Sequence, residues 1–251
     1  MEWGVLLVAG LFLPLFPQSM LFNALFARVQ QPLLRAFLVL AWPQVGIVLV
    51  VAFIEELPGW LPYWGAATAL MYALRALALR DIGLWAAFIA TSAWSLLWIS
   101  VGQGTDTRYL TLFALGMSLP LILLIFLCHW LERRFGAAYL GLYGGLAQTA
   151  PRFSGILVMV VLGILATPVF PSFFALLSMI IESMQMNLFL AVAVGTVWLL
   201  WSWAGANLLQ GLVAGPKQES VGDLGCGLMW LNIAVLSGLA VTGVYCLGAV
   251  V

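Results

Sequence analysis

The stretch YLGLYGGLAQTAPRFSGILVMVVLGILATPVFPSFFALLSMIIE, residues 139–182, decides the fold. A glycine-rich segment leads into an apolar run that begins at Phe153 and ends at Ile181, with Pro168 and Pro171 near its middle. Proline lacks a backbone N–H and clashes with the preceding helical turn, so we expect a helix that is interrupted at these prolines. The 29 residues from 153 to 181 would span about 43 Å as a helix, whereas the hydrocarbon core of a bilayer is ~30 Å thick. The segment must therefore tilt, bend or unwind.

An interrupted helix at membrane depth has two readings. Unpaired backbone groups are tolerated there only where protein or a water-filled cavity covers them. Such breaks line ion or substrate pathways in many transporters. The simpler alternative is a proline kink that only shapes helix packing.

The composition predicts a membrane protein with several spans. The chain has 251 residues, of which 65% are hydrophobic and 7% charged, and its mean hydropathy is +1.13. A soluble domain needs far more surface charge. The net charge is zero, which argues against a nucleic-acid partner. One histidine and three widely separated cysteines form no metal-ligand spacing or nucleophile pattern, so we expect no metal, no cofactor and no catalytic residue.

We expect an all-α protein with about eight transmembrane helices in a single domain over residues 1–251. Pro14 and Pro17 should kink the first span, and a short polar link with Arg28 and Arg35 follows it. The predicted spans cover residues 3–27, 36–54, 61–79, 82–101, 109–131, 153–181, 187–213 and 227–248.

The basic residues predict the orientation in the membrane, because cytoplasmic links are enriched in lysine and arginine. The links that follow odd-numbered spans carry nearly all of them, namely Arg28, Arg35, Arg80, Arg133, Arg134, Arg152 and Lys217. The even-numbered links carry only Arg108, against Glu55, Glu56, Asp106 and Glu182. We therefore expect odd links in the cytoplasm and both termini on the outer side.

The twelve tryptophans fall into two groups. Some lie near predicted span ends, where indole rings anchor at the headgroup level, for example Trp3, Trp60, Trp64, Trp130 and Trp230. Others lie deeper, and we expect them to pack between helices: Trp94, Trp198, Trp201 and Trp203.

Several motifs resemble the antiporter-like, proton-translocating subunits of respiratory complex I. The same module occurs in multisubunit cation/proton antiporters, membrane-bound hydrogenases and inorganic-carbon uptake complexes. The matching features are an acidic-basic pair at a helix end (Glu132-Arg133), a cytoplasmic loop with Gly144, Gly145 and Pro151, and a break with Pro168, Pro171, Ser172 and Phe173. Residues 81–251 carry the resemblance and residues 1–80 match weakly. On this register the eight spans resemble the last eight of the family's fourteen.

The departures from the family shape the functional prediction. The resemblance implies a bacterial inner-membrane location and a central file of ionisable residues that carries protons. No predicted span contains lysine, and Leu176 or Leu177 stands where the family has an ionisable residue. A segment without such residues has little means of relaying protons. We therefore expect a degenerate, partner-dependent half of the module.

Four residues are candidates for an ion pathway. His129, beside Glu132, is either a titratable gate or an interfacial residue bonded to a helix end or water. Arg75 either faces a buried acidic partner, on this chain or on another, or extends to the cytoplasmic interface, which is the simpler account. Glu182 either lines an exit path or is a solvated turn residue.

Two functions follow from the sequence. The first is an accessory, non-catalytic membrane subunit of a proton- or cation-coupled complex, with an inorganic-carbon uptake complex as one host. Its partner would be a full-length antiporter-like or catalytic subunit. The alternative is an independent secondary transporter with a substrate site at the broken helices.

Overall fold

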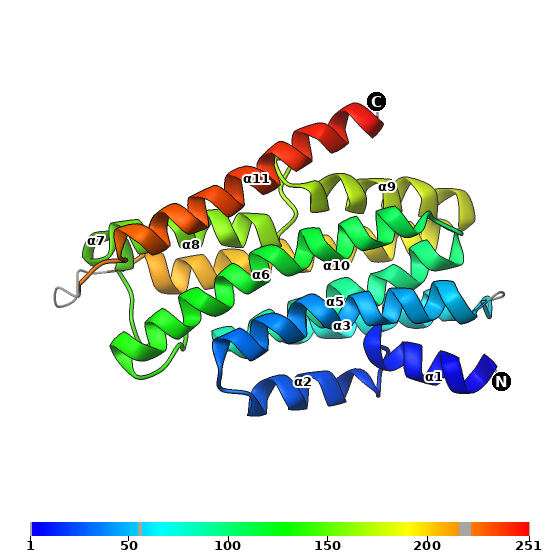
Figure 1. Cartoon of the computed structure of the whole chain (residues 1–251), viewed down its shortest axis with the longest axis horizontal. Helices are drawn as coiled ribbons and strands as arrows, with labels where there is room; N and C mark the ends of the chain where they lie inside the picture. The colour runs from blue at the N-terminus through cyan, green and yellow to red at the C-terminus, as the bar shows by residue number, and fades with distance from the viewer. Residues whose placement is uncertain (1, 55–56, 216–221, 251) are drawn as a thin grey trace.

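The structure, a computed structural model, describes residues 2–54, 57–215 and 222–250 (Figure 1). This part of the chain is mostly helical and contains no β-strand, as expected for an all-α protein. The helices are α1 (Glu2–Phe12), α2 (Ser19–Arg28), α3 (Pro32–Phe53), α4 (Leu61–Ala76), α5 (Ile82–Gly102), α6 (Thr107–Phe135), α7 (Leu146–Thr149), α8 (Pro151–Ile164), α9 (Pro171–Met186), α10 (Leu188–Val213) and α11 (Cys226–Val250).

Each predicted span corresponds to a helix or to an interrupted pair of helices. Five helices, α3, α5, α6, α10 and α11, are long and apolar enough to cross a membrane. The shorter α4 accounts for the predicted span 61–79, and the pairs α1/α2 and α8/α9 account for the first and sixth. The chain is thus an all-α, multi-pass membrane protein.

The predicted interruption in 153–181 is confirmed. Helix α8 ends at Ile164 and α9 begins at Pro171. The helix therefore ends before Pro168, while Pro171 starts the next helix at a position where the missing N–H costs nothing. Between them, Ala166 adopts a left-handed conformation with φ of +49°.

The first predicted span is also interrupted, rather than only kinked. Helix α1 ends at Phe12 and α2 begins at Ser19, so the segment with Pro14 and Pro17 is not helical. Two prolines three residues apart remove two backbone donors from adjacent turns, which a single kink does not absorb.

The helices run roughly alongside one another, and α5 lies at the centre of the packing (Figure 1). Almost all of α5 is buried, whereas only 33% of α3 and 22% of α11 is buried. Trp94 and Trp201 are fully buried between helices, and Trp198 is partly buried, as expected. Trp203 does not pack between helices of this chain, because its side chain is 60% exposed.

The two ends of the bundle differ in charge. One end, on the left in Figure 1 and called the basic end below, contains the last turns of α2, α4, α6 and α10 and the first turns of α3, α5, α8 and α11. It carries Arg28, Arg35, Arg75, Arg80, Arg133, Arg134 and Arg152, whereas the opposite end has Arg108 among its described residues. Glu55, Glu56, Lys217 and the side chain of Cys246 lie outside the part described.

Candidate functional site

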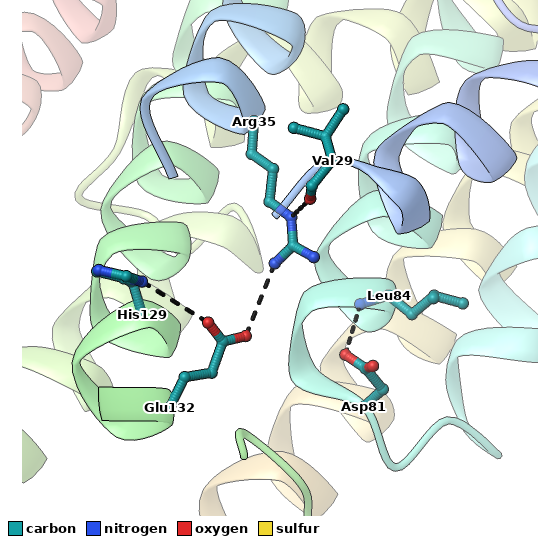
Figure 2. Close-up of polar contacts among 6 residues, drawn as sticks. All are labelled: Val29, Arg35, Asp81, Leu84, His129 and Glu132. Carbon is teal, nitrogen blue, oxygen red and sulfur yellow. Dashed lines mark hydrogen bonds and ion pairs between the residues drawn. The ribbon is translucent and has the colours of Figure 1, made fainter. Parts of the chain in front are cut away.

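An ionic cluster lies at the basic end, between the start of α3 and the end of α6 (Figure 2). Arg35 Nη1 lies 3.8 Å from Glu132 Oε1, and His129 Nδ1 lies 3.7 Å from Glu132 Oε2. His129 and Glu132 are three residues apart on α6, so they share one face of the helix. The predicted proximity of His129 and Glu132 is thus present, with Arg35 as a third member.

Arg35 is the most enclosed charge of the cluster. Its side chain is 11% exposed, against 32% for Glu132. Its Nε donates a 2.6 Å hydrogen bond to the Val29 carbonyl, and its guanidinium lies 5.2 Å from the centre of the Phe26 ring. The sequence placed Arg35 in a polar link. In the structure it lies in the first turn of α3 and joins the α2–α3 connection to α6.

A cavity of about 440 Å³ adjoins the cluster, lined in part by Gln30, Arg35, Asp81, Glu132 and Tyr139. Asp81 lies at its edge, where Oδ1 accepts a hydrogen bond from the Leu84 N–H and caps α5 (Figure 2). Both signs of charge line this cavity, so it is a polar recess at the basic end of the bundle.

Arg75 does not join the cluster. Its side chain is exposed near the end of α4, and no ion pair involves it within the described residues. A long side chain at a helix end reaches the interface easily. Within the described residues no acidic side chain pairs with Arg75, and its extension to the interface stays a prediction.

Glu182 lies at the opposite end of the bundle from Glu132. It is a half-buried residue of α9 rather than a turn residue, and it accepts a 3.3 Å hydrogen bond from Thr105 Oγ1. In the amide orientation that satisfies both of its polar atoms, the Gln103 side-chain nitrogen donates to Glu182 Oε2 at 3.0 Å. The Gln103 side-chain oxygen then accepts from the Ser183 N–H, also at 3.0 Å. These contacts tie the α5–α6 connection to the end of α9.

The loop with Gly144 and Gly145 has a packing role in the structure. The Gly145 N–H donates to the Ala214 carbonyl at 2.8 Å, and Gly145 adopts a left-handed φ of +70° just before α7. A Cβ on Gly144 would lie 3.0 Å from the same carbonyl. Pro151 is the first residue of α8, and the N–H groups of the next two residues donate to the Asp223 carboxylate. The loop therefore fixes the starts of α8 and α11 against the end of α10.

Side chains of the protein itself cover the break between α8 and α9. Trp198 Nε1 donates to the Leu165 carbonyl at 3.0 Å, and Thr167 Oγ1 donates to the Leu162 carbonyl at 3.1 Å. Buried Ser172 lies 3.4 Å from the Gly163 carbonyl and can donate to it. Phe173 packs beside Trp198, with ring centres 5.7 Å apart.

The break between α1 and α2 is covered in the same way. Indole N–H groups donate to a carbonyl in the last turn of α1, from Trp42 to Leu11 (2.9 Å), and to two carbonyls of the break, from Trp98 to Leu13 (2.9 Å) and from Trp64 to Phe16 (2.8 Å). Ser95 Oγ donates to the Pro14 carbonyl at 2.6 Å. Backbone groups that a broken helix leaves unpaired at membrane depth are thus satisfied by protein, as the apolar environment requires.

A glycine of a neighbouring helix packs directly on each break. A Cβ on Gly46 of α3 would lie 2.8 Å from the Leu13 nitrogen, and a Cβ on Gly243 of α11 would overlap the Val169 carbonyl oxygen. Only glycine allows a helix to approach another backbone this closely. The two breaks are therefore closely packed.

Sequence reasoning missed Arg35 as part of the cluster and missed the tryptophans that cover the breaks. The position of Arg35, three residues after the proline that begins α3, could have placed it inside a helix. Nothing near the tryptophans in the sequence indicates their hydrogen-bond acceptors, because each indole N–H donates to a carbonyl from a distant part of the chain.

No set of three or more His, Cys, Asp or Glu side chains that could hold a metal comes together in the part of the chain that the structure describes. Every Asp, Glu, Lys, Arg and His of the described helices lies within two turns of a helix end. The middle of the bundle therefore offers neutral hydrogen bonds and no charged relay.

The fold is similar to that of chains in several solved membrane complexes. A chain of respiratory complex I from Thermus thermophilus superposes with a TM-score of 0.85 at 20% sequence identity, over 98% of this chain and 58% of that one. For the Mrp complex from Dietzia sp. DQ12-45-1b the TM-score is 0.85 at 15% identity, over 98% and 56%. For the membrane-bound sulfane sulfur reductase, an archaeal respiratory membrane complex, it is 0.82 at 14% identity, over 99% and 54%.

This chain has the fold of those membrane-complex chains. It spans a little over half of their length. No family model matches the sequence, and no curated protein matches it either. The resemblance to the complex I-related family is thus confirmed at the level of the fold. The structures superpose well although the sequence identities are only 14–20%.

Proposed function

We propose that this chain is a non-catalytic membrane subunit of a multi-subunit proton- or cation-coupled complex, and that it does not form a complete ion pathway by itself. The observation that carries the proposal is the separation of the titratable groups. Glu132 and His129 lie at one end of the bundle and Glu182 at the other, while the described side chains between them are uncharged. Ion and proton pathways in membranes depend on ionisable or well-hydrated groups at depth.

The helix breaks support the same proposal. Their carbonyls accept hydrogen bonds from tryptophan and hydroxyl side chains, and glycines pack against their backbone. A substrate or ion site at a discontinuous helix uses these carbonyls as ligands. Carbonyls that already have protein partners are poor ligands, which argues against the alternative of an independent transporter.

The shared fold supports a role inside a larger assembly. The similar chains belong to a respiratory complex I, an Mrp complex and a membrane-bound sulfane sulfur reductase. We propose that a full-length antiporter-like or catalytic subunit is the partner of this chain. We also propose an inorganic-carbon uptake complex as the first host to test, because its catalytic partner would supply the zinc chemistry that this chain lacks.

The charge asymmetry supports a proposed orientation. Seven described arginines lie at the basic end and one at the opposite end. We propose that the basic end faces the cytoplasm of a bacterial inner membrane, with the start of α1 and the end of α11 on the outer side.

Co-purification tests the proposal. The chain, tagged and expressed together with its neighbouring genes, should purify with at least one other membrane subunit in a fixed ratio. A monodisperse single chain that drives solute uptake on its own in proteoliposomes would contradict the proposal and favour the transporter.

A further inference from the structure

The exposed face of α10 carries polar groups at membrane depth. Its exposed residues recur every three or four positions and so form one stripe along the helix. This α10 stripe consists of Val192, Thr196, Leu199, Ser202, Trp203, Ala206, Asn207 and Gln210. The 26 residues of α10 span about 39 Å, so a ~30 Å hydrocarbon core encloses all but about 5 Å at each end.

Trp203 has an unusual position for an exposed tryptophan. It is residue 16 of the 26 in α10 and is 60% exposed. The other strongly exposed tryptophans, Trp3, Trp60, Trp64 and Trp230, lie at or near the first turn of their helices, which suits the headgroup level. Trp203 lies about 15 Å from the end of α10, and its indole N–H has no acceptor among the described residues.

Asn207 lies one turn further along the same stripe. It is exposed about 9 Å before the end of α10, and its carboxamide makes no hydrogen bond to any described residue. The hydroxyls of Thr196 and Ser202, by contrast, donate to carbonyls of α10 itself. A carboxamide and an indole N–H facing lipid tails have no partner there, and leaving them unpaired is costly.

The exposed face of α3 shows what a lipid-facing surface looks like in this protein. From Leu33 to Phe53 its exposed residues are apolar, for example Phe37 and Val48. Lipid tails can cover such a surface without leaving any hydrogen-bonding side chain unpaired. The α10 stripe differs from it in needing hydrogen-bond partners at depth.

We propose that the α10 stripe is the contact surface for a transmembrane helix of another subunit. Asparagine side chains hydrogen-bond between helices in membranes, and small residues such as Ser202 and Ala206 let a second helix approach closely. Trp203 would then be packed between helices, as its depth requires, and would be an anchor of the interface. The partner helix presents a hydrogen-bonding side chain opposite Asn207. This inference rests on the proposed function, which supplies the second subunit.

Site-specific photocrosslinking in the intact complex tests the inference. A photoreactive phenylalanine analogue replaces Trp203 in one variant and Val48 of α3 in the matched control, and the complex is irradiated in native membranes. We expect a crosslink to a different subunit from position 203, and none from position 48.

A second measurement follows the affinity of this chain for its partner subunit. Asn207→Leu and Trp203→Leu should each lower the yield of co-purified partner about three- to twenty-fold, the range expected for one interhelical hydrogen bond or more. Phe37→Leu, an exposed change on α3, should leave the yield unchanged. Because both stripe residues are exposed, the thermal stability of the isolated chain should not fall in any of the three variants.

The outcomes separate this inference from the proposed function. A crosslink from position 203 to a different subunit, together with a lowered yield of that subunit in the Asn207→Leu and Trp203→Leu variants, supports both. Crosslinks from position 203 only to lipid, or to a second copy of this chain, while another subunit still co-purifies, overturn the inference and leave the proposed function standing. If no subunit co-purifies with the unmodified chain, both are wrong.

Discussion

At the residue scale, Arg35 is the most buried charged side chain of the cluster and makes the most contacts. It combines a hydrogen bond to the Val29 carbonyl, an ion pair with Glu132 and a cation–π contact with Phe26, with only 11% of its side chain exposed. Glu132 is more exposed and its ion pair is long at 3.8 Å, so most of the stabilisation should come from the contacts of Arg35 to α2 and the α2–α3 link.

Replacing the two partners should therefore have unequal effects. Arg35→Leu should lower the free energy of unfolding by about 2 kcal/mol, because it removes a charged donor from a carbonyl and a packed side chain. Glu132→Gln should cost about 0.5 kcal/mol, as for a partly exposed ion pair. Unfolding in detergent measures both, with the exposed Arg75→Leu as control. Equal losses for the two cluster variants would show that the ion pair itself dominates.

His129 should act as an interfacial residue rather than as a gate. Its one charged neighbour is Glu132 within the described residues, and a single histidine without a relay moves no proton across the bilayer. We expect His129→Ala to leave the coupled activity of the complex unchanged from about pH 6 to pH 8. A variant that loses activity over this range would restore the gate hypothesis.

At the scale of elements, the two interrupted helices share one design. In each, indole N–H groups donate to the freed carbonyls and a glycine of an adjacent helix packs on the backbone. The breaks shape the bundle while their backbone groups remain paired. This arrangement favours the packing role of the prolines over the pathway role.

Removing one indole donor tests this design. Trp198→Phe should lower the free energy of unfolding by about 1–3 kcal/mol, because the Leu165 carbonyl loses its partner in an apolar site. Trp203→Phe is the matched control, since its N–H donates to no described residue, and should change stability by less than about 0.5 kcal/mol in the isolated chain. Similar losses in both variants would mean that ring size, and not the hydrogen bond, matters.

The glycines on the breaks provide an independent test. Gly46→Ala and Gly243→Ala should each cost about 1–3 kcal/mol of stability, because the added methyl group meets backbone atoms that cannot move away easily. Gly155→Ala in α8 is the control, because no neighbouring atom lies within 4 Å of the place that an added Cβ would occupy. It should be neutral or stabilising by up to about 1 kcal/mol. Thermal unfolding in detergent ranks the three variants, and an unchanged Gly46→Ala would contradict close packing at the first break.

The sequence predicted the elements better than their contacts. Pro168 and Pro171 located the second interruption because proline acts locally on the backbone. The same reasoning predicted only a kink for the first span, where Pro14 and Pro17 lie in a complete break. The carbonyl partners of Trp98 and Trp198, and the salt bridge of Arg35 with Glu132, join residues far apart in the chain. Such pairs follow from tertiary packing, which a single sequence does not display.

At the scale of the whole molecule, charge is confined to the two ends. The resemblance that predicted a complex I-related fold is confirmed by the shared fold, and the predicted absence of ionisable residues at depth agrees with the described helices. Glu132 and Glu182, both named as pathway candidates, lie at opposite ends of the bundle and hold neighbouring connections together.

Proton flux through the purified chain in proteoliposomes is the most direct test of this account. With an imposed pH gradient and membrane potential, the chain alone should carry no more flux than protein-free vesicles, while the intact complex in the same vesicles should translocate. Flux through the chain alone that disappears in Glu132→Gln or Glu182→Gln would show that a continuous pathway runs through these helices, and would contradict the account.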